Sequence, residues 1–484
     1  MPRKPLLAAF LSSLLAGCAS IPHVRPEVGQ VSAATMGLAG GPAVTIAPDW
    51  WAAIGDPQLD RIMADALANS PSLAEASARL RIARAAVDTS RAGLQPQITA
   101  SASEQRQLFS GRSVIPPPYG GSSQWVGSTE ADLDWSLDLA GRQRAAVDAA
   151  RTSASAAALD IAAARVVLAG SVVQTYVNLA RADALAAIAN DFARSRQSAL
   201  DIAQTRQRTS LGSAFEVSAA KALLAEARQA QVRAEGERQQ MVHALAALAG
   251  RGVDYYPNID APALKLDATL PVPDSLPADL LARRPDIQAA QARIRAADAG
   301  RREARAAFYP DVDLRAFVGT AALGLGTLFT GGALTAGAGP AIHLPIFAGG
   351  KLSAGYRGAV GQVDVAIAGY DRLVTEAVHQ AADALSAIAT HTADAAEQKA
   401  VVSELENTVR LDAVRVRTGL ASRLDVLDAN DRLLTARQAQ ANIDADGAIS
   451  RIQLLIALGG GFTPMSAPPA LAARESRPSL WTTP

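Results

Sequence analysis

The side chains best suited to covalent, metal or redox chemistry are few and badly spaced for it. The chain of 484 residues has one cysteine, Cys18, and five histidines, of which His379 and His391 are twelve residues apart. A lone thiol forms no intramolecular disulfide, and zinc ribbons and redox dithiols need paired ligands. Lys plus Arg and Asp plus Glu both number 46, so no nucleic-acid partner is indicated. We therefore expect no metal, no non-covalent cofactor and no enzyme activity.

Carboxylates cluster in one stretch of alternating polar and apolar residues, 123–139. The four acids on its even positions are Glu130, Asp132, Asp134 and Asp138, whereas Leu133 and Trp135 occupy odd positions. Because successive side chains of a strand point to opposite faces, these carboxylates share one face. Strict alternation favours the polar lining of a lumen over a pair of acid–base catalysts.

Three other segments alternate in the same way: 96–110, 310–320 and 334–347. An alternating segment of about ten residues crosses a bilayer as a tilted strand. Four strands cannot close a barrel, because lipid leaves no edge unpaired and the smallest barrels have about eight strands. The chain is thus expected to share a barrel with copies of itself, and both two and three copies are compatible with this reasoning. A water-soluble sandwich is the alternative, but it would need more strands.

Landmarks recur in the two halves of the chain. Two pairs of prolines have the same spacing of 25 residues: Pro71 with Pro96, and Pro285 with Pro310. The segment RTSLGSAFEV at 208–217 also matches RTGLASRLDV at 417–426, at an offset of 209. The sequence therefore predicts a tandem duplication, each copy containing a helix, two strands and two long helices.

Long helices are expected where proline is missing: 141–208, 214–249, 350–417 and 423–458. From Val363 to Ile388 apolar residues recur every three or four positions, which is typical of a coiled-coil seam. At 1.5 Å per residue the longer helices would measure about 100 Å, too long for an ordinary globular domain.

The N-terminus has the order of a secretory signal. Arg3 and Lys4 precede the apolar run 6–15, which is too short to span a bilayer. Leu15-Ala16-Gly17-Cys18 resembles the lipobox of bacterial lipoproteins, in which the cysteine is acylated, for example with palmitate. This resemblance implies a covalent lipid on Cys18, and Ala19 in place of aspartate implies sorting to the outer membrane. An ordinary signal peptide with an incidental cysteine is the alternative.

Together these features resemble the TolC-like family of outer-membrane efflux proteins, in particular the NodT-like lipoprotein subclass that serves RND-type tripartite pumps. The resemblance extends from Trp50 to Gly460, and its most specific parts include the lipobox, the duplication, and TGLAS at 418–422 followed by DVLDA at 425–429. It implies a mixed α and β membrane protein. Three copies would each contribute four strands to a 12-stranded outer-membrane β-barrel, continued by a long periplasmic α-helical barrel.

The resemblance also implies that the breaks between long helices are tips that contact a periplasmic adaptor, or membrane fusion, protein. The tip residues are Thr209, Ser210, Leu211, Gly212, Thr418, Gly419, Leu420, Ala421 and Ser422. Gly212 and Gly419 would permit the tight reversal. Ser210 stands where the second copy has Gly419, which is a departure from the pattern.

Three acids just beyond the tips, Glu216, Asp425 and Asp428, match the family's acidic ring at the periplasmic entrance. Repeated around a threefold axis, they would attract cations and form a gate or selectivity ring. The alternative is that they are ordinary acids at helix N-termini, stabilised by the helix dipole. The family often pairs them with an aromatic and a basic residue, but Val416 and Ala421 stand in those places.

The implied function is a passive exit channel that exports drugs or other small molecules across the periplasm and outer membrane. Its partners would be two further copies of the chain, the adaptor, an inner-membrane efflux pump and outer-membrane lipid. A type I protein-secretion duct is one alternative, and a lipid-anchored coiled-coil scaffold without a pore is another. The expected divisions are a signal peptide 1–17, a lipid-anchored tether 18–49, a first repeat 50–250, a linker 251–275, a second repeat 276–460 and a tail 461–484.

Overall fold

The computed structural model describes residues 21–32, 34–36, 46–112, 114–267, 270, 272 and 284–463. The expected signal peptide, Cys18 and most of the C-terminal tail therefore lie outside the described residues. The chain divides into two compact units, each built from both halves of the sequence. Unit 1 comprises 1–30, 78–158 and 289–370, and unit 2 comprises 31–77, 159–288 and 371–484.

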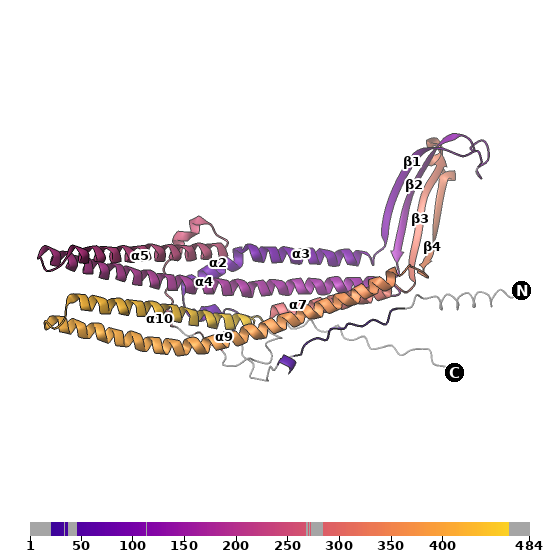
Figure 1. Ribbon diagram of the computed structural model, residues 1–484. Coiled ribbons are helices and arrows are strands. Elements are labelled where there is room, and N and C mark those ends of the chain that lie inside the picture. Colours follow the sequence, from indigo (N-terminus) through magenta and orange to yellow (C-terminus); the bar gives the residue numbers. More distant parts are fainter. Residues whose placement is uncertain are drawn as a thin grey trace. The chain divides into compact units, whose positions relative to one another are not determined.

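Unit 1 contains one antiparallel sheet of four strands in the order β1-β2-β3-β4 (Figure 1). The strands are β1 (Gln97–Leu108), β2 (Ser123–Ser136), β3 (Asp311–Leu323) and β4 (Leu334–His343). Pairing of β2 with β3 joins the two repeats. Strands β1 and β4 are consequently the two edges of the sheet.

The strand register brings the predicted faces of all four strands together. Leu133 of β2 lies opposite Ile98 of β1 and Ala316 of β3, and Val318 of β3 lies opposite Ala336 of β4. Side chains of this apolar face remain uncovered by the described chain, Ile98 being 73% exposed and Val318 52% exposed. An apolar face open to the surroundings is the arrangement that suits lipid.

Three predicted strand ends are wrong. β2 ends at Ser136 rather than at 139, and β4 ends at His343 rather than at 347. β3, in contrast, continues to Leu323, past the predicted end at 320. Asp138 has a φ of 47°, in the left-handed region, so the chain turns there before the next helix starts. Pro345, two residues past β4, has no backbone N–H to donate to a strand ladder.

Equivalent helices of the two repeats have equal lengths, which confirms the duplication. The pairs are α3 (Pro71–Ala92) and α7 (Pro285–Ala306) with 22 residues each, α4 (Arg142–Arg208) and α9 (Lys351–Arg417) with 67, and α5 (Ala214–Leu248) and α10 (Arg423–Ala457) with 35. Shorter elements are η1 (Ala34–Met36), η2 (Trp50–Ile54), α2 (Pro57–Asn69), η3 (Val253–Asn258), α8 (Leu325–Leu328) and η4 (Gly331–Ala333).

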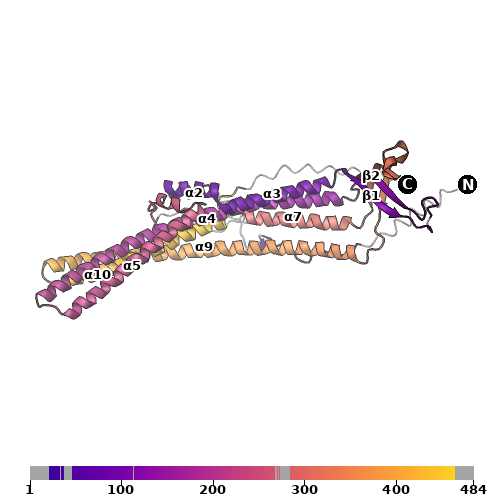
Figure 2. The same ribbon diagram turned by 90° about the horizontal axis from the view of Figure 1, so that it is seen from above.

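In unit 2 the helices form two antiparallel hairpins, α4 with α5 and α9 with α10, as both ribbon views show (Figures 1 and 2). The largest core brings together Tyr176 of α4, Leu245 of α5 and Ile452 of α10, all fully buried. The Tyr176 hydroxyl donates to Asp56 Oδ2 at 2.6 Å, and Asp56 Oδ1 in turn caps α2 by accepting from the Gln58 N–H at 3.0 Å. The polar groups in this core are thereby satisfied by one another.

A smaller core in unit 1 lies where α7 ends and α9 begins, close to the sheet. Phe308, Tyr356 and Val360 are buried there, and Ile21 and Val24 of the N-terminal tether pack against them. The tether is therefore anchored to the body of unit 1 by apolar contacts.

Candidate functional site

The first tip joins α4 to α5. The Leu211 N–H donates to the Arg206 carbonyl at 2.8 Å and the Ser210 N–H to the Gln207 carbonyl at 3.0 Å. Ser210 adopts a φ of 59°, in the left-handed region. These two bonds and the left-handed residue form a Schellman cap. Ser213 then starts α5, because its Oγ accepts from the Glu216 N–H at 3.2 Å.

The second tip, between α9 and α10, repeats the same cap. The Leu420 N–H donates to the Arg415 carbonyl at 2.8 Å and the Gly419 N–H to the Val416 carbonyl at 3.1 Å, with a Gly419 φ of 74°. Each bond lies 209 residues after its counterpart, the offset found in the sequence. The departure at Ser210 therefore leaves the backbone of the first tip unchanged.

Gly212 has a different role from the one that the sequence suggested. Its backbone is not in the left-handed region, but a Cβ atom there would lie 2.9 Å from Glu216 Oε2 and 3.0 Å from Arg206 Cβ. The residue that reverses the first tip is Ser210. Gly212 instead permits the close approach of Arg206 and Glu216.

Large apolar side chains are exposed at both tips. Leu211 is 73% exposed, Phe215 80% and Leu420 73%. The tip hydroxyls of Thr209 and Thr418 bond back to carbonyls of their own helices. Exposed apolar groups over hydrogen-bonded caps suit contact with another protein. Phe215 was missed from the sequence, although an aromatic residue two positions after a helix-capping serine is distinctive in a chain with 4% aromatic residues.

The three predicted gate acids have different surroundings. Glu216 Oε2 lies 3.9 Å from Arg206 Nη1. Asp425 Oδ2 accepts from the Ser422 N–H at 2.7 Å, which together with the Ser422 side chain makes a capping box at the start of α10. Asp428 is exposed, and among the described residues it makes no hydrogen bond or ion pair. Among the described residues, no hydrogen bond joins Glu216 to either aspartate.

A fourth acid on α10, Asp431, is buried and was missed. It accepts from Ser195 Oγ at 2.8 Å and pairs with Arg196 Nη2 at 2.9 Å, so it ties α10 to α4. The signal was available, because Asp431 continues the spacing of three begun by Asp425 and Asp428. A buried acid with two partners is a structural contact that holds the helix carrying Asp428.

The acids of β2 do gather on one face of the sheet. Glu130, Asp132 and Asp134 occupy alternate positions, and Asp134 Oδ1 lies 3.1 Å from Arg315 Nε of β3. Arg315 Nη2 is also 3.7 Å from Asp313 Oδ2. These side chains are mostly exposed, so the pairs contribute little to stability, and their negative charge remains available to ions.

Asp138 does not belong to that set. It lies past the end of β2, its side chain is buried, and its two carboxylate oxygens accept from the Gln143 and Arg144 N–H groups at 2.8 and 3.0 Å. Asp138 therefore caps α4 rather than lining the polar face of the sheet. The alternation of the sequence continues through residue 138 and so gave no warning of the turn.

The described residues include no group of three or more His, Cys, Asp or Glu that could hold a metal ion. His243 instead stacks on Tyr256, with ring centroids 4.4 Å apart. His379 Nδ1 lies 3.4 Å from Asp383 Oδ2 of its own helix.

Comparison with known proteins agrees with this architecture. The family model described as "Outer membrane efflux protein" matches residues 62–251 and 276–460, which are the two repeats. The outer membrane protein VceC of Vibrio cholerae has the same fold, with a TM-score of 0.77 and 32% identity over 87% of this chain and 100% of that one.

Curated relatives are similar over most of their length. The fusaric acid resistance protein FusA of Burkholderia cepacia is 36% identical over 361 residues, 72% of this chain and 68% of that protein. The probable efflux pump outer membrane protein TtgC of Pseudomonas putida is 30% identical over 470 residues, 96% of each chain.

Proposed function

The chain belongs to the outer membrane efflux protein family, and we propose that three copies of it form the exit duct of a tripartite pump for small toxic molecules. It is a channel of the outer membrane, in a family whose members are not enzymes. The observation that carries the proposal is the sheet, whose apolar face is uncovered and whose two edges are unpaired in the part of the chain that the structure describes. Edges in lipid must be paired, so β1 of one copy would pair with β4 of the next.

Three copies give twelve strands, and the long helices of each copy would continue the barrel as a periplasmic tube. The relatives' names support small-molecule cargo, since they refer to efflux pumps and to resistance against fusaric acid. The same names favour efflux over the protein-secretion duct. In a periplasmic scaffold without a pore, the apolar face of the sheet would be exposed to water, which is unfavourable.

The tips are proposed to dock the adaptor through Leu211, Phe215 and Leu420. The acid proposed as the main contributor to the entrance ring is Asp428, which is exposed and has no partner in the described chain. Glu216 and Asp425 contribute charge to the same ring while they also serve the tips' own structure. Glu130, Asp132 and Asp134 are proposed to line the lumen of the barrel.

The number of copies is tested by native mass spectrometry of the full chain, extracted from outer membranes in mild detergent. One chain weighs 50.0 kDa before processing, so the expected particle has about three times the mature mass. A particle of one or two chains would refute the trimeric barrel. The same spectra report whether the mature N-terminus carries acyl chains at Cys18.

A further inference from the structure

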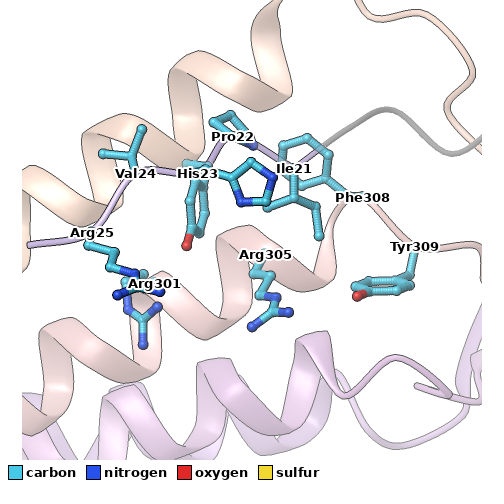
Figure 3. Close-up of a pocket in the computed structure, with 10 residues that line it drawn as sticks. Ile21, Pro22, His23, Val24, Arg25, Arg301, Arg305, Phe308 and Tyr309 are labelled. Atoms are coloured by element: carbon cyan, nitrogen blue, oxygen red, sulfur yellow. The ribbon is translucent and has the colours of Figure 1, made fainter.

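A cavity of about 680 Å³ lies in unit 1 between the tether residues 21–25 and helices α7 and α9 (Figure 3). This volume is within the range of roughly 300–1,000 Å³ found for small-molecule sites. Three arginines line it, Arg25 from the tether and Arg301 and Arg305 from α7, and its described lining includes no Asp or Glu. Figure 3 shows Arg25 reaching towards Arg301, with Arg305 one helical turn further along.

The positive charge of this cavity is only partly balanced by the chain. Arg301 Nη2 donates to Asp298 Oδ1 at 2.7 Å, and this hydrogen bond raises the pKa of Arg301. Arg25 and Arg305 are exposed and make no hydrogen bond or ion pair within the described ranges. Guanidinium groups without a carboxylate partner suit a phosphate, whose oxygens match the two-pronged geometry of arginine.

The other wall of the cavity is apolar. Phe308 is 3% exposed and Tyr356 5%, and their rings meet edge to face with centroids 6.3 Å apart. Ile21 of the tether packs against the same group. A cavity with cationic and apolar walls suits an amphiphile better than a small inorganic ion.

The cavity lies close to the end of the sheet where α7 leads into β3 and where β4 is followed by α9. Tyr309 is two residues before β3 starts at Asp311, and Tyr356 lies in the first turns of α9, which starts at Lys351. Tyrosine and arginine side chains next to the ends of membrane-spanning strands are typical of a membrane–water interface with anionic lipid.

We propose that this cavity binds the phosphate of an anionic phospholipid from the periplasmic leaflet of the outer membrane. Arg25, Arg305 and Arg301 would hold the headgroup, and Phe308 and Tyr356 would contact the start of its acyl chains. The bound lipid would fasten the tether to α7 through the arginines of both segments, and to α9 through Tyr356. The proposal rests on the proposed function only for the orientation of the strands in the membrane.

Native mass spectrometry of the full chain in detergent tests this site. Dioctanoyl phosphatidylglycerol and dioctanoyl phosphatidylethanolamine are titrated separately, and retained lipid is counted per chain. We expect one phosphatidylglycerol per chain, bound about tenfold more tightly than phosphatidylethanolamine. The double variant Arg25→Gln with Arg305→Gln should lose this preference, and Arg25→Gln alone, in the non-helical tether, should weaken it.

Arg295→Gln is the matched control, because Arg295 is also an exposed arginine of α7 but does not line the cavity. Equal lipid binding by the control and the double variant would overturn the proposal, as would the lack of any preference in the wild type. Displacement of phosphatidylglycerol by millimolar inorganic phosphate would assign the site to soluble phosphate and overturn the lipid assignment. A particle that is not trimeric but keeps the preference would refute the proposed function alone, whereas a trimer without it would refute this inference alone.

Discussion

Ser210 in the first tip and Gly419 in the second are equivalent residues with different side chains. The two hydrogen bonds of the cap are nevertheless the same in both tips. Ser210 and Gly419 occupy the same left-handed position, with φ values of 59° and 74°. A residue with a Cβ atom pays about 1 kcal/mol for this conformation, whereas glycine does not. The first tip therefore holds its turn at the expense of some local stability.

Exchanging the two residues should exchange the local stabilities. Ser210→Gly should slow hydrogen exchange of the Leu211 amide about fivefold, and Gly419→Ser should speed exchange of the Leu420 amide by a similar factor, from a difference of about 1 kcal/mol. Exchange followed by mass spectrometry of tip peptides measures both. Faster exchange in Ser210→Gly would show that the serine makes a favourable contact of its own.

Asp65 of α2 carries a pH-dependent contact in unit 2. It accepts from the Tyr255 hydroxyl at 2.7 Å and from Arg251 Nη2 at 3.1 Å. The Tyr255 hydrogen bond, followed by that of Arg251, lowers the pKa of Asp65. Burial, followed by the bond to Asp65, raises the pKa of Tyr255 to about 12. The contact is thus strongest with an ionised aspartate and a neutral phenol.

The lowered pKa of Asp65 determines how the stability of the fold depends on pH, because proton binding and folding are linked. A carboxyl with a lowered folded-state pKa stabilises the fold above its unfolded pKa of about 4 and loses that effect as the pH falls. Asp65→Asn should therefore lower the melting temperature at neutral pH, and its difference from the wild type should shrink below pH about 4. Asp60→Asn, an exposed neighbour on α2, is the control. Identical pH profiles for the two variants would count against the assigned role of Asp65.

Helix α10 has two acids near its start, Asp425 and Asp428, which have different roles. Asp425 completes the capping box, so Asp425→Asn should weaken the start of α10 by about 1 kcal/mol. Asp428 has no partner in the described residues, so Asp428→Asn should leave stability unchanged and lower cation selectivity.

Reversal potentials across a planar bilayer with a salt gradient measure this selectivity. Asp394→Asn is the control, because Asp394 is an exposed acid of α9 away from the tip. If Asp428→Asn gives the same potential as the wild type and Asp394→Asn, Asp428 is not the main contributor to ion selectivity.

Element types and most boundaries could be predicted because each has a simple sequence period. Alternation predicted four strands, and uninterrupted helical patterning predicted α4 and α9 to within one residue. The end of β2 could not be predicted, because the turn at Asp138 depends on a carboxylate that reaches the amides of Gln143 and Arg144. The spacing of three pointed to Asp431 as a further acid of α10, but it could not predict the burial of Asp431, because the partners Ser195 and Arg196 are distant in sequence.

For the whole molecule, the sequence showed the duplication but could not show where the tether lies. Contacts of Glu27 and Val28 with Asp364 join residues more than 330 positions apart, and no sequence period reports such pairs. The cavity lined by Arg25 and Arg305 was missed for that reason.

The tether contacts suggest that the covalent lipid is not the main support of the channel. Ile21 and Val24 pack against Phe308 and Tyr356 without any help from Cys18. Cys18→Ser with a cleavable signal should therefore still yield some trimeric channel in outer-membrane fractions, as judged by native mass. Complete loss of trimers would show that the acyl chains are required for assembly.

We propose that copies of this outer-membrane channel enclose one continuous water-filled pore. The most direct test of this proposal is the conductance of the purified full chain in planar lipid bilayers. We expect discrete, long-lived conductance steps that favour cations, with the preference reduced in Asp428→Asn. Bilayers that stay silent although protein has inserted would contradict it.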